Sequence, residues 1–291
     1  MTTVYITEKP SAAKELATYL SGGAAPRRGE DRNVYRGQGW AVVCAQGHLY
    51  ESANIDYYIE RRFPDAPRNS KGNLKWSLDH LPCFPDAAEW KVLPITKNKD
   101  KIASIRALLK EATSVVHAGD ADREGQRVVD EVLQQLGWKK PVTRVLLKAL
   151  NAPEIAKAMA AAKDNREFRG MCEASRARDR ADGLVGWHFS RLVSIKAQER
   201  GYKDVVSIGR IQTPVLGFIV ARELEIRNFK PVDYYEPYAV IRVKGGSFRA
   251  KWAPRPDQAG LDDEGRLLDQ RIAQGLQQRV HGRAALIAQY K

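Results

Sequence analysis

Cysteine is scarce in this sequence of 291 residues, and no long apolar run occurs in it. The three cysteines, Cys44, Cys83 and Cys172, are odd in number, far apart and not in a Cys-x-x-Cys pair. That distribution argues against a disulfide framework or a zinc site, and we expect buried, reduced thiols in a cytosolic protein. No stretch approaches the roughly 18 apolar residues of a membrane span. The N-terminus lacks the basic-then-apolar pattern of a secretion signal.

Acidic residues are outnumbered by basic ones. The chain has 35 Asp and Glu against 48 Lys and Arg, which gives a net charge of +13. Such an excess favours a polyanionic partner. Hydrophobic residues make up 43% of the sequence, enough for real cores, and the length suits about two ordinary domains.

Strand-like and helix-like segments alternate in the first half of the chain. We expect strands at 3–7, 40–44, 114–118 and 142–147, and helices at 12–20, 97–112 and 127–136. This alternation predicts an α/β domain with a mostly parallel sheet. Prolines interrupt 52–98, which we expect to be an ordered insertion rather than a sheet.

The second half of the chain changes character twice. Residues 152–196 are rich in Ala and Arg at helical spacing, and 214–226 is again helix-like. After Pro231 the pattern predicts strands at 238–243 and 247–252, a polar loop at 254–266, and a last segment, 270–280, that fits a strand edge or a helix start.

An acidic motif follows the predicted strand 114–118. Its residues are Asp120-Ala121-Asp122-Arg123-Glu124-Gly125, within a predicted polar loop at 119–125. In open α/β sheets, ligands bind at the carboxyl ends of strands. Alternate residues of an extended loop point the same way, so Asp120 and Asp122 can share one cation, and oxygen ligands suit Mg²⁺. The alternative is a solvated acidic turn that caps the next helix.

Glu8 also follows a predicted strand directly, and parallel strands can bring it beside Asp120 and Asp122. Crowded carboxylates raise one another's proton affinity or hold a metal. A glutamate so placed can exchange a proton with a phosphoester oxygen. Lys9 could stabilise a phosphoryl group, although a solvated surface lysine is an equal alternative.

Two further segments predict contacts to a nucleic-acid strand. Arg178 and Asp182 are four residues apart, so an ion pair on one helix face can fix the guanidinium for a phosphate. Residues 207–213 combine a glycine with the hydroxyl, guanidinium and amide groups of Ser207, Arg210 and Gln212, which suit a strand backbone and a base edge. The alternative is a structural ion pair and a capped helix start.

These motifs resemble a known family. Thr7-Glu8-Lys9-Pro10-Ser11 and the acidic motif resemble the Toprim fold of topoisomerases, primases and some nucleases. The segments around Arg178 and at 207–214 resemble the A-R-x-x-x-D-x-L-V-G and S-x-G-R-V-Q-T-P-x-L segments of type IA DNA topoisomerases. Ile211 and Trp187 replace the usual Val and Tyr. Gly47-His48-Leu49-x-Glu51 also matches a family segment, and the Glu8 and Pro214 motifs are closer to the topoisomerase III branch.

The resemblance implies a domain order and a site. We expect a Toprim domain at 1–150, a mainly helical single-strand-binding domain at 151–230, and the beginning of a β-rich arch at 231–291. Glu8 would be the general acid and base, and Lys9 would contact the scissile phosphate. Mg²⁺ would be held by Glu8, Asp120 and Asp122, with Glu124 supporting them. The strand would be positioned by Arg178, Asp182, Ser207, Arg210 and Gln212; His48 is interpreted as structural.

The family's nucleophilic tyrosine lies in a segment close to T-Y-P-R-T, and none of the 11 tyrosines here is followed by Arg at the second position. We therefore expect this chain to bind Mg²⁺ and DNA without cleaving. The expected partners are single-stranded or negatively supercoiled DNA, with RNA as a second substrate, for a monomeric, cytoplasmic protein associated with a bacterial nucleoid. Alternatives are a non-catalytic Toprim-type binding module and, less favoured because of the arginine segments, a primase or nuclease.

Overall fold

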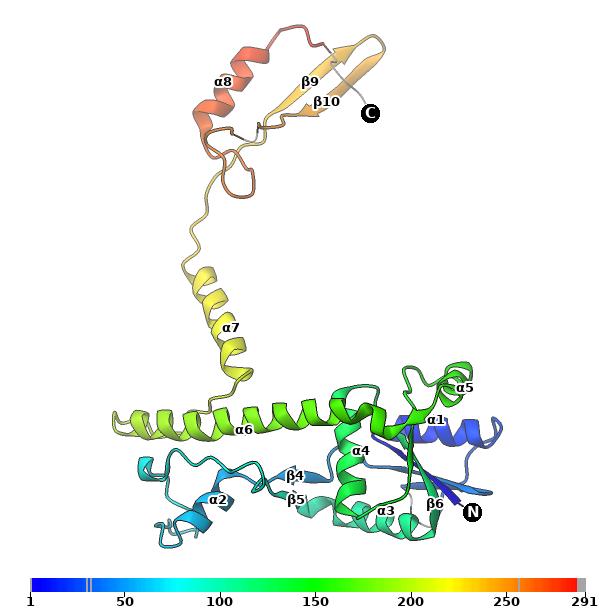
Figure 1. The fold of residues 1–291 in the computed structure, drawn as a ribbon. Coiled ribbons are helices and arrows are strands. Elements are labelled where there is room, and N and C mark those ends of the chain that lie inside the picture. Colours follow the sequence, from blue (N-terminus) through cyan, green and yellow to red (C-terminus); the bar gives the residue numbers. More distant parts are fainter. Residues whose placement is uncertain (1, 30, 32, 256, 287–291) are drawn as a thin grey trace. The chain divides into compact units, whose positions relative to one another are not determined.

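The computed structural model describes residues 2–286 apart from 30, 32 and 256. The chain divides into two compact units, one up to Val215 and one from Leu216 onward (Figure 1). Among the described residues, no helix combines the length and the apolar character needed to cross a membrane.

The first unit is built on a six-stranded sheet with the order β2-β3-β1-β6-β7-β8. The strands are β1 (Thr2–Thr7), β2 (Val34–Gly37), β3 (Trp40–Cys44), β6 (Ala112–Ala118), β7 (Val142–Arg144) and β8 (Lys163–Asp164). The four inner strands are parallel, and the edge strands β2 and β8 are antiparallel to their neighbours. Tyr5 pairs with Val42 on one side and with Val116 on the other.

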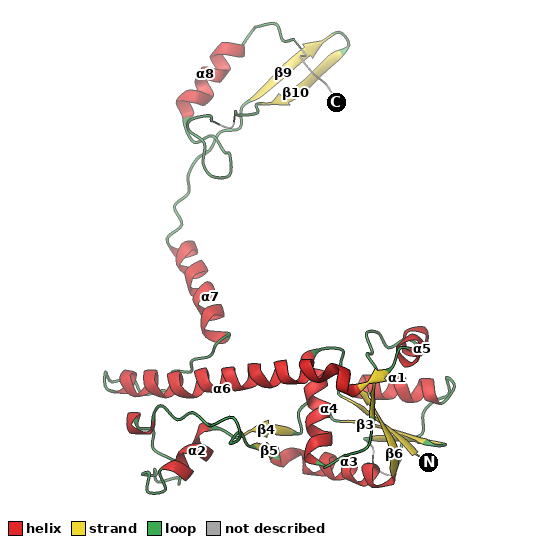
Figure 2. Ribbon diagram, in the orientation of Figure 1, coloured by secondary structure: helices red, strands yellow, loops and turns green. Residues whose placement is uncertain are grey.

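Helices cover both faces of this sheet (Figure 2). The helices are α1 (Pro10–Leu20), α3 (Lys99–Glu111), α4 (Arg123–Gln135) and α5 (Ala152–Ala160). Successive strand residues point to opposite faces. Val4 and Ile6 therefore pack with α3 and α4, whereas Tyr5 packs with α1 and α5. The predicted α/β class with a mostly parallel sheet is confirmed.

The insertion after β3 is ordered and has a core of its own. It contains β4 (Tyr50–Ser52), α2 (Ile55–Arg62), β5 (Val92–Pro94) and 3₁₀ turns at Leu78–His80 and Thr96–Asn98. Strands β4 and β5 pair antiparallel, so a small sheet closes the insertion. Its hydrophobic core consists of the buried residues Ala53, Ile55, Tyr58, Ile59, Leu74 and Cys83.

A long helix, α6 (Arg169–Gln198), follows a 3₁₀ turn at Asn165–Phe168 and packs against α4 (Figure 1). Trp187 of α6 stacks on Trp90 of the insertion, with ring centroids 5.7 Å apart and planes at 26°. The same helix therefore contacts the sheet domain and its insertion.

Helix α7 (Gln212–Arg227) crosses the boundary between the two units. The second unit contains an antiparallel hairpin of β9 (Tyr238–Val243) and β10 (Gly246–Lys251), followed by α8 (Gln270–Val280). The segment 270–280, predicted as a strand edge or a helix start, is a helix whose first amides are capped by Asp269, which accepts from the Arg271 amide at 2.8 Å.

Three local expectations need correction. Helix α4 begins at Arg123, so Glu124 lies in its first turn and not in a polar loop up to residue 125. Strand β7 ends at Arg144 rather than at 147. The insertion contains the β4–β5 pair, although it was not expected to form a sheet. The three-part division at residues 150 and 230 stays a prediction.

Candidate metal and nucleic-acid site

Glu8 and the acidic motif follow neighbouring strands at the same edge of the sheet. Strands β1 and β6 are parallel, and their last residues, Thr7 and Ala118, pair with each other. Glu8 comes directly after β1, and Asp120 comes two residues after β6. The predicted neighbours are therefore brought together at the carboxyl ends of the central strands, where α/β folds bind ligands.

The Glu8 carboxylate is partly buried, and its Oε2 atom is buried without a hydrogen-bond partner. Burial raises the pKa of Glu8, and the charges of Asp120 and Asp122 raise it further. An unpartnered buried carboxylate oxygen is costly unless it takes up a proton or a cation. Glu8 is therefore suited either to hold a proton or to ligate a metal ion.

Lys9, next to Glu8, forms an ion pair with Asp120. The hydrogen bond to Asp120 and that residue's charge raise the pKa of Lys9. The Lys9 side chain remains 61% exposed, so its ammonium can also reach an anion that enters from solvent. Lys9 was predicted either to contact a phosphate or to be a solvated surface lysine. In the structure it is an exposed cation at the edge of the acidic cluster, which is compatible with both.

Asp122 caps helix α4, because its Oδ1 accepts a hydrogen bond from the Gly125 amide at 2.7 Å. The helix-capping alternative therefore applies to Asp122, although a cap uses only one carboxylate oxygen. Glu124 is held by two partners: His48 Nε2 at 2.7 Å and Ser175 Oγ at 2.8 Å.

His48 and Ser175 are the neighbours that sequence reasoning left out. His48 lies 2.7 Å from Glu124, and its carbonyl accepts a hydrogen bond from Asn98 Nδ2 at 2.8 Å. The match of Gly47-His48-Leu49-x-Glu51 to a family segment was the signal for His48. Ser175 carried no signal, because its role depends on the approach of α6 to α4.

The carboxylates fit Mg²⁺ as a partial ligand set. In the described part of the chain, no three His, Cys, Asp or Glu side chains are already arranged as a metal cage. Magnesium keeps several waters and takes only one or two carboxylates together with substrate phosphates, so a complete cage is not required. The unpartnered Glu8 Oε2 and the adjacent Asp120 and Asp122 offer oxygen donors of the right kind.

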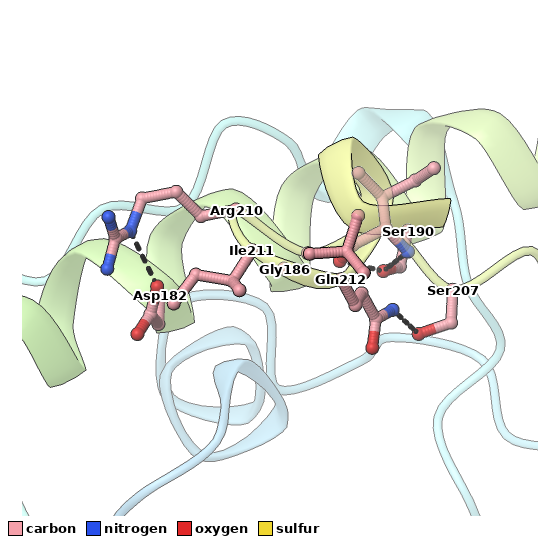
Figure 3. A pocket seen from close by; sticks show the side chains of 10 residues that line it. Asp182, Gly186, Ser190, Ser207, Arg210, Ile211 and Gln212 are labelled. Carbon is pink, nitrogen blue, oxygen red and sulfur yellow. Dashed lines mark hydrogen bonds and ion pairs between the residues drawn. The ribbon is translucent and has the colours of Figure 1, made fainter. Parts of the chain in front are cut away.

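Four of the five predicted strand-binding residues line an open pocket of about 640 Å³ where the segment after α6 returns along that helix (Figure 3); they are Asp182, Ser207, Arg210 and Gln212. Two serines of α6 hold this segment. Ser194 Oγ accepts from the Val206 amide at 2.8 Å, and Ser190 Oγ accepts from the Ile208 amide at 2.9 Å. The same hydroxyls also donate to the carbonyls of Val206 and Ile208. The two serines therefore satisfy the backbone groups of these residues, as a neighbouring β-strand would.

Polar side chains in the pocket are paired with one another. Asp182 Oδ1 accepts from Arg210 Nε at 2.7 Å, and Asp182 Oδ2 lies 3.7 Å from Arg178 Nε. Gln212 Nε2 donates to Ser207 Oγ at 2.8 Å (Figure 3). Asp182 thus orients two exposed guanidinium groups, which is an arrangement suited to phosphate contacts.

Helix α6 links the acidic cluster to this pocket. Ser175 contacts Glu124, and Asp182 lies seven residues further along the same helix. At about 1.5 Å per residue, the two positions are about 10 Å apart along the helix axis. That spacing is within the reach of a few nucleotides of one strand.

Comparisons with known proteins identify the family of the chain. The Toprim domain family matches residues 3–157, and the DNA topoisomerase family matches residues 166–291. The chain is 35% identical to DNA topoisomerase 3 of Vibrio cholerae over 99% of its own length and 44% of that protein. It is also 35% identical to DNA topoisomerase 3 of Salmonella typhimurium over 99% of its length and 43% of that protein.

The chain thus spans less than half the length of these curated relatives. Its fold resembles full-length topoisomerase I from Thermotoga maritima, with a TM-score of 0.54, 19% identity, and coverage of 94% of this chain and 37% of that one. The chain belongs to the Toprim family and carries, after its Toprim domain, the domain of the bacterial type IA DNA topoisomerases.

Proposed function

We propose that this chain supplies the magnesium-binding and single-strand-binding part of a topoisomerase III-like enzyme. The observation that carries the proposal is the meeting of Glu8 with Asp120 and Asp122 at the ends of β1 and β6. The pocket is lined by Asp182 and Arg210, and Asp182, which also pairs with Arg178, belongs to the same helix that contacts Glu124; this supports one continuous DNA site. DNA is the proposed partner, with RNA as a second substrate.

In the proposed reaction of the whole protein, a tyrosine oxygen bonds to a backbone phosphorus and gives up its proton to solvent, while the bond from that phosphorus to the neighbouring sugar oxygen breaks. The phosphotyrosyl link keeps the bond energy until the reverse step reseals the strand. Glu8, Asp120 and Asp122 would hold Mg²⁺, which when bound supplies positive charge to the phosphate. Glu8 has a raised pKa and would give a proton to the leaving sugar oxygen and take it back on resealing. Lys9 would contact the phosphate, and Arg178 and Arg210 would position the strand.

A second candidate is a non-catalytic Toprim module that binds single strands without metal. The internal partners of the acidic side chains favour it: Asp120 pairs with Lys9, Asp122 caps α4, and Glu124 is bonded by His48 and Ser175. The two candidates differ in whether Mg²⁺ changes strand binding.

Fluorescence anisotropy with a labelled single-stranded oligonucleotide, with and without Mg²⁺, tests the proposal. We expect Mg²⁺ to strengthen binding to the wild type and to have a smaller effect on Glu8→Gln. Glu111→Gln is the matched control, since this exposed residue precedes β6 at its opposite end. Equal affinities of the wild type with and without Mg²⁺ would favour the non-catalytic module.

Denaturing gels of the same mixtures test the expected lack of cleavage. We expect no covalent protein–DNA adduct, because none of the chain's tyrosines occurs in the family's nucleophile segment. An adduct would place the nucleophile among these residues and contradict the proposal.

A further inference from the structure

A buried arginine forms hydrogen bonds to the backbone of the acidic loop on the side that faces the protein interior. Arg144, the last residue of β7, is only 1% exposed. Its guanidinium donates from Nη2 to the Asp120 carbonyl at 2.6 Å and from Nη1 to the Gly119 carbonyl at 2.7 Å. A second bond from Nη1 reaches its neighbour Val145, at 2.9 Å. Most arginine side chains lie in solvent, whereas the buried guanidinium of Arg144 uses its N–H groups to bond backbone carbonyls of the loop.

The orientation of the Arg144 guanidinium is fixed by a residue of α4. Arg144 Nε donates to Gln126 Oε1 at 2.7 Å, and Gln126 is fully buried. Gln126 in turn donates from Nε2 to Asp130 at 2.9 Å and to Asn165 at 2.8 Å. The planar fork of an arginine suits this task, because one side chain can serve acceptors in three directions without rotating.

The position of Arg144 also matters for charge. Burial lowers its pKa to about 10, so the group remains a cation at neutral pH. The carboxylates whose charges raise its pKa again are Asp130 first and then Asp122, Asp120 and Glu8, and the last three are the proposed metal ligands. A fixed positive charge behind the loop offsets the repulsion among three carboxylates that would otherwise push the loop away from Glu8.

We infer that Arg144 is the positioning residue of the magnesium site: it fixes the loop that carries Asp120 and Asp122 by bonding the loop carbonyls from the protein side. This inference rests on the proposed function. Arg144 does not ligate the metal, and its direct electrostatic effect on a cation is repulsive. Removal of the charge alone would therefore strengthen Mg²⁺ binding, whereas loss of loop positioning weakens it.

The test is Mg²⁺ binding by isothermal titration calorimetry, at a temperature at which every variant is folded. Arg144→Lys keeps the charge and loses the fork, and we expect its Mg²⁺ affinity to fall by about 10- to 100-fold, as for other partners that orient metal ligands. Val132→Ala is the control: Val132 is buried in α4 among the residues packed with α3, so the variant loses packing in the same unit without touching the loop. We expect its affinity to stay within twofold of wild type.

Hydrogen exchange of residues 118–125 gives a readout that needs no metal. We expect faster exchange there in Arg144→Lys and unchanged exchange in Val132→Ala. If Arg144→Lys does not fold, Gln126→Met removes the acceptor that aims the guanidinium, and the same two results are expected. Affinity within twofold of wild type and unchanged loop exchange would overturn the inference.

The outcome also separates this inference from the proposed function. A wild-type chain that binds no Mg²⁺ contradicts the metal site, and with it the role of Arg144 toward that metal. A wild-type chain that binds Mg²⁺, together with an Arg144→Lys variant that binds it equally well, contradicts the role of Arg144 alone.

Discussion

At the scale of single residues, a buried histidine of the first unit bonds only backbone groups. His117 in β6 is completely buried; its Nε2 bonds the Gln126 carbonyl at 3.1 Å, and its Nδ1 accepts from the Gly119 amide at 3.3 Å. These bonds correspond to the neutral imidazole. Burial, reinforced by the charge of Arg144, lowers the pKa of His117 to about 3.

Stability should therefore decrease as the pH falls below about 6.5, the ordinary histidine pKa. Between that value and about 3 the unfolded chain binds a proton at His117 and the folded chain does not, so folding loses up to about 1.4 kcal/mol per pH unit. Above pH 6.5 this contribution is fully present. Urea unfolding at pH 7, 6, 5 and 4 measures it.

The control is His117→Gln, which cannot titrate. We expect this variant to be less stable than wild type at pH 7 but to lose less stability between pH 6.5 and 4. Parallel curves for the two proteins would show that His117 is not the group responsible.

At the scale of elements, the acidic loop and the start of α4 approach each other so closely that only glycine fits. A Cβ atom on Gly125 would lie 2.6 Å from the backbone N and O of Asp120, and one on Gly119 would lie 2.5 Å from the Gly125 carbonyl oxygen. The contacts are backbone to backbone, so no flexible side chain can move aside.

Gly125→Ala should therefore destabilise the unit. The gain in helix propensity is at most about 1 kcal/mol, whereas overpacking typically costs about 1–3 kcal/mol, so a net loss is expected. Mg²⁺ affinity should fall as well, because Asp120 must shift. Thermal unfolding and Mg²⁺ titration measure the two effects.

Gly170→Ala is the matched control, because no heavy atom lies within 4 Å of a Cβ placed there in α6. It should leave both quantities unchanged or slightly raise the stability. A Gly125→Ala protein with wild-type stability and Mg²⁺ affinity would contradict the close approach.

The sequence predicted the elements whose pattern is local. Strand β3 at 40–44 and strand β9 at 238–243 are found at the predicted residues, because apolar and β-branched side chains follow one another there. The short edge strands β2 and β8 were missed. Strand β8 has only two residues, Lys163 and Asp164, and it exists because of its pairing with β7 rather than its composition.

In the candidate site, too, the residues with a local sequence pattern could be predicted and those positioned by tertiary contacts could not. Glu8, Asp120 and Asp122 could be proposed from their place after strands, since the carboxyl ends of parallel strands lie at one edge. The role of Arg144 could not be predicted, because nothing in its local sequence indicates that its side chain bonds the loop between β6 and α4. Asp122 was expected as a ligand, and its bond to Gly125 also gives it the capping role.

At the scale of the whole molecule, the net charge of +13 and the exposed guanidinium groups predict salt-sensitive DNA binding. If Arg178, Arg210 and about three other cations meet phosphates, log K against log salt should have a slope of about −3.5 for a single strand. Arg210→Ala should weaken binding and make the slope less steep by about 0.7.

Anisotropy titrations between 50 and 200 mM salt would measure this slope. Arg222→Ala is a suitable comparison: Arg222 is an exposed arginine of α7 that pairs with Glu225 at 3.0 Å and does not line the pocket. We expect it to leave the slope near the wild-type value. An unchanged slope in Arg210→Ala would remove Arg210 from the strand interface.

Glu8, Asp120 and Asp122 are proposed to form a single divalent-metal site at the ends of β1 and β6. Crystals soaked in Mn²⁺, which takes the same oxygen ligands as Mg²⁺, allow the ion to be located by its anomalous scattering. We expect an anomalous peak within ligand distance of Glu8 and at least one of the two aspartates. A peak elsewhere, or none at saturating Mn²⁺, would contradict the proposed site.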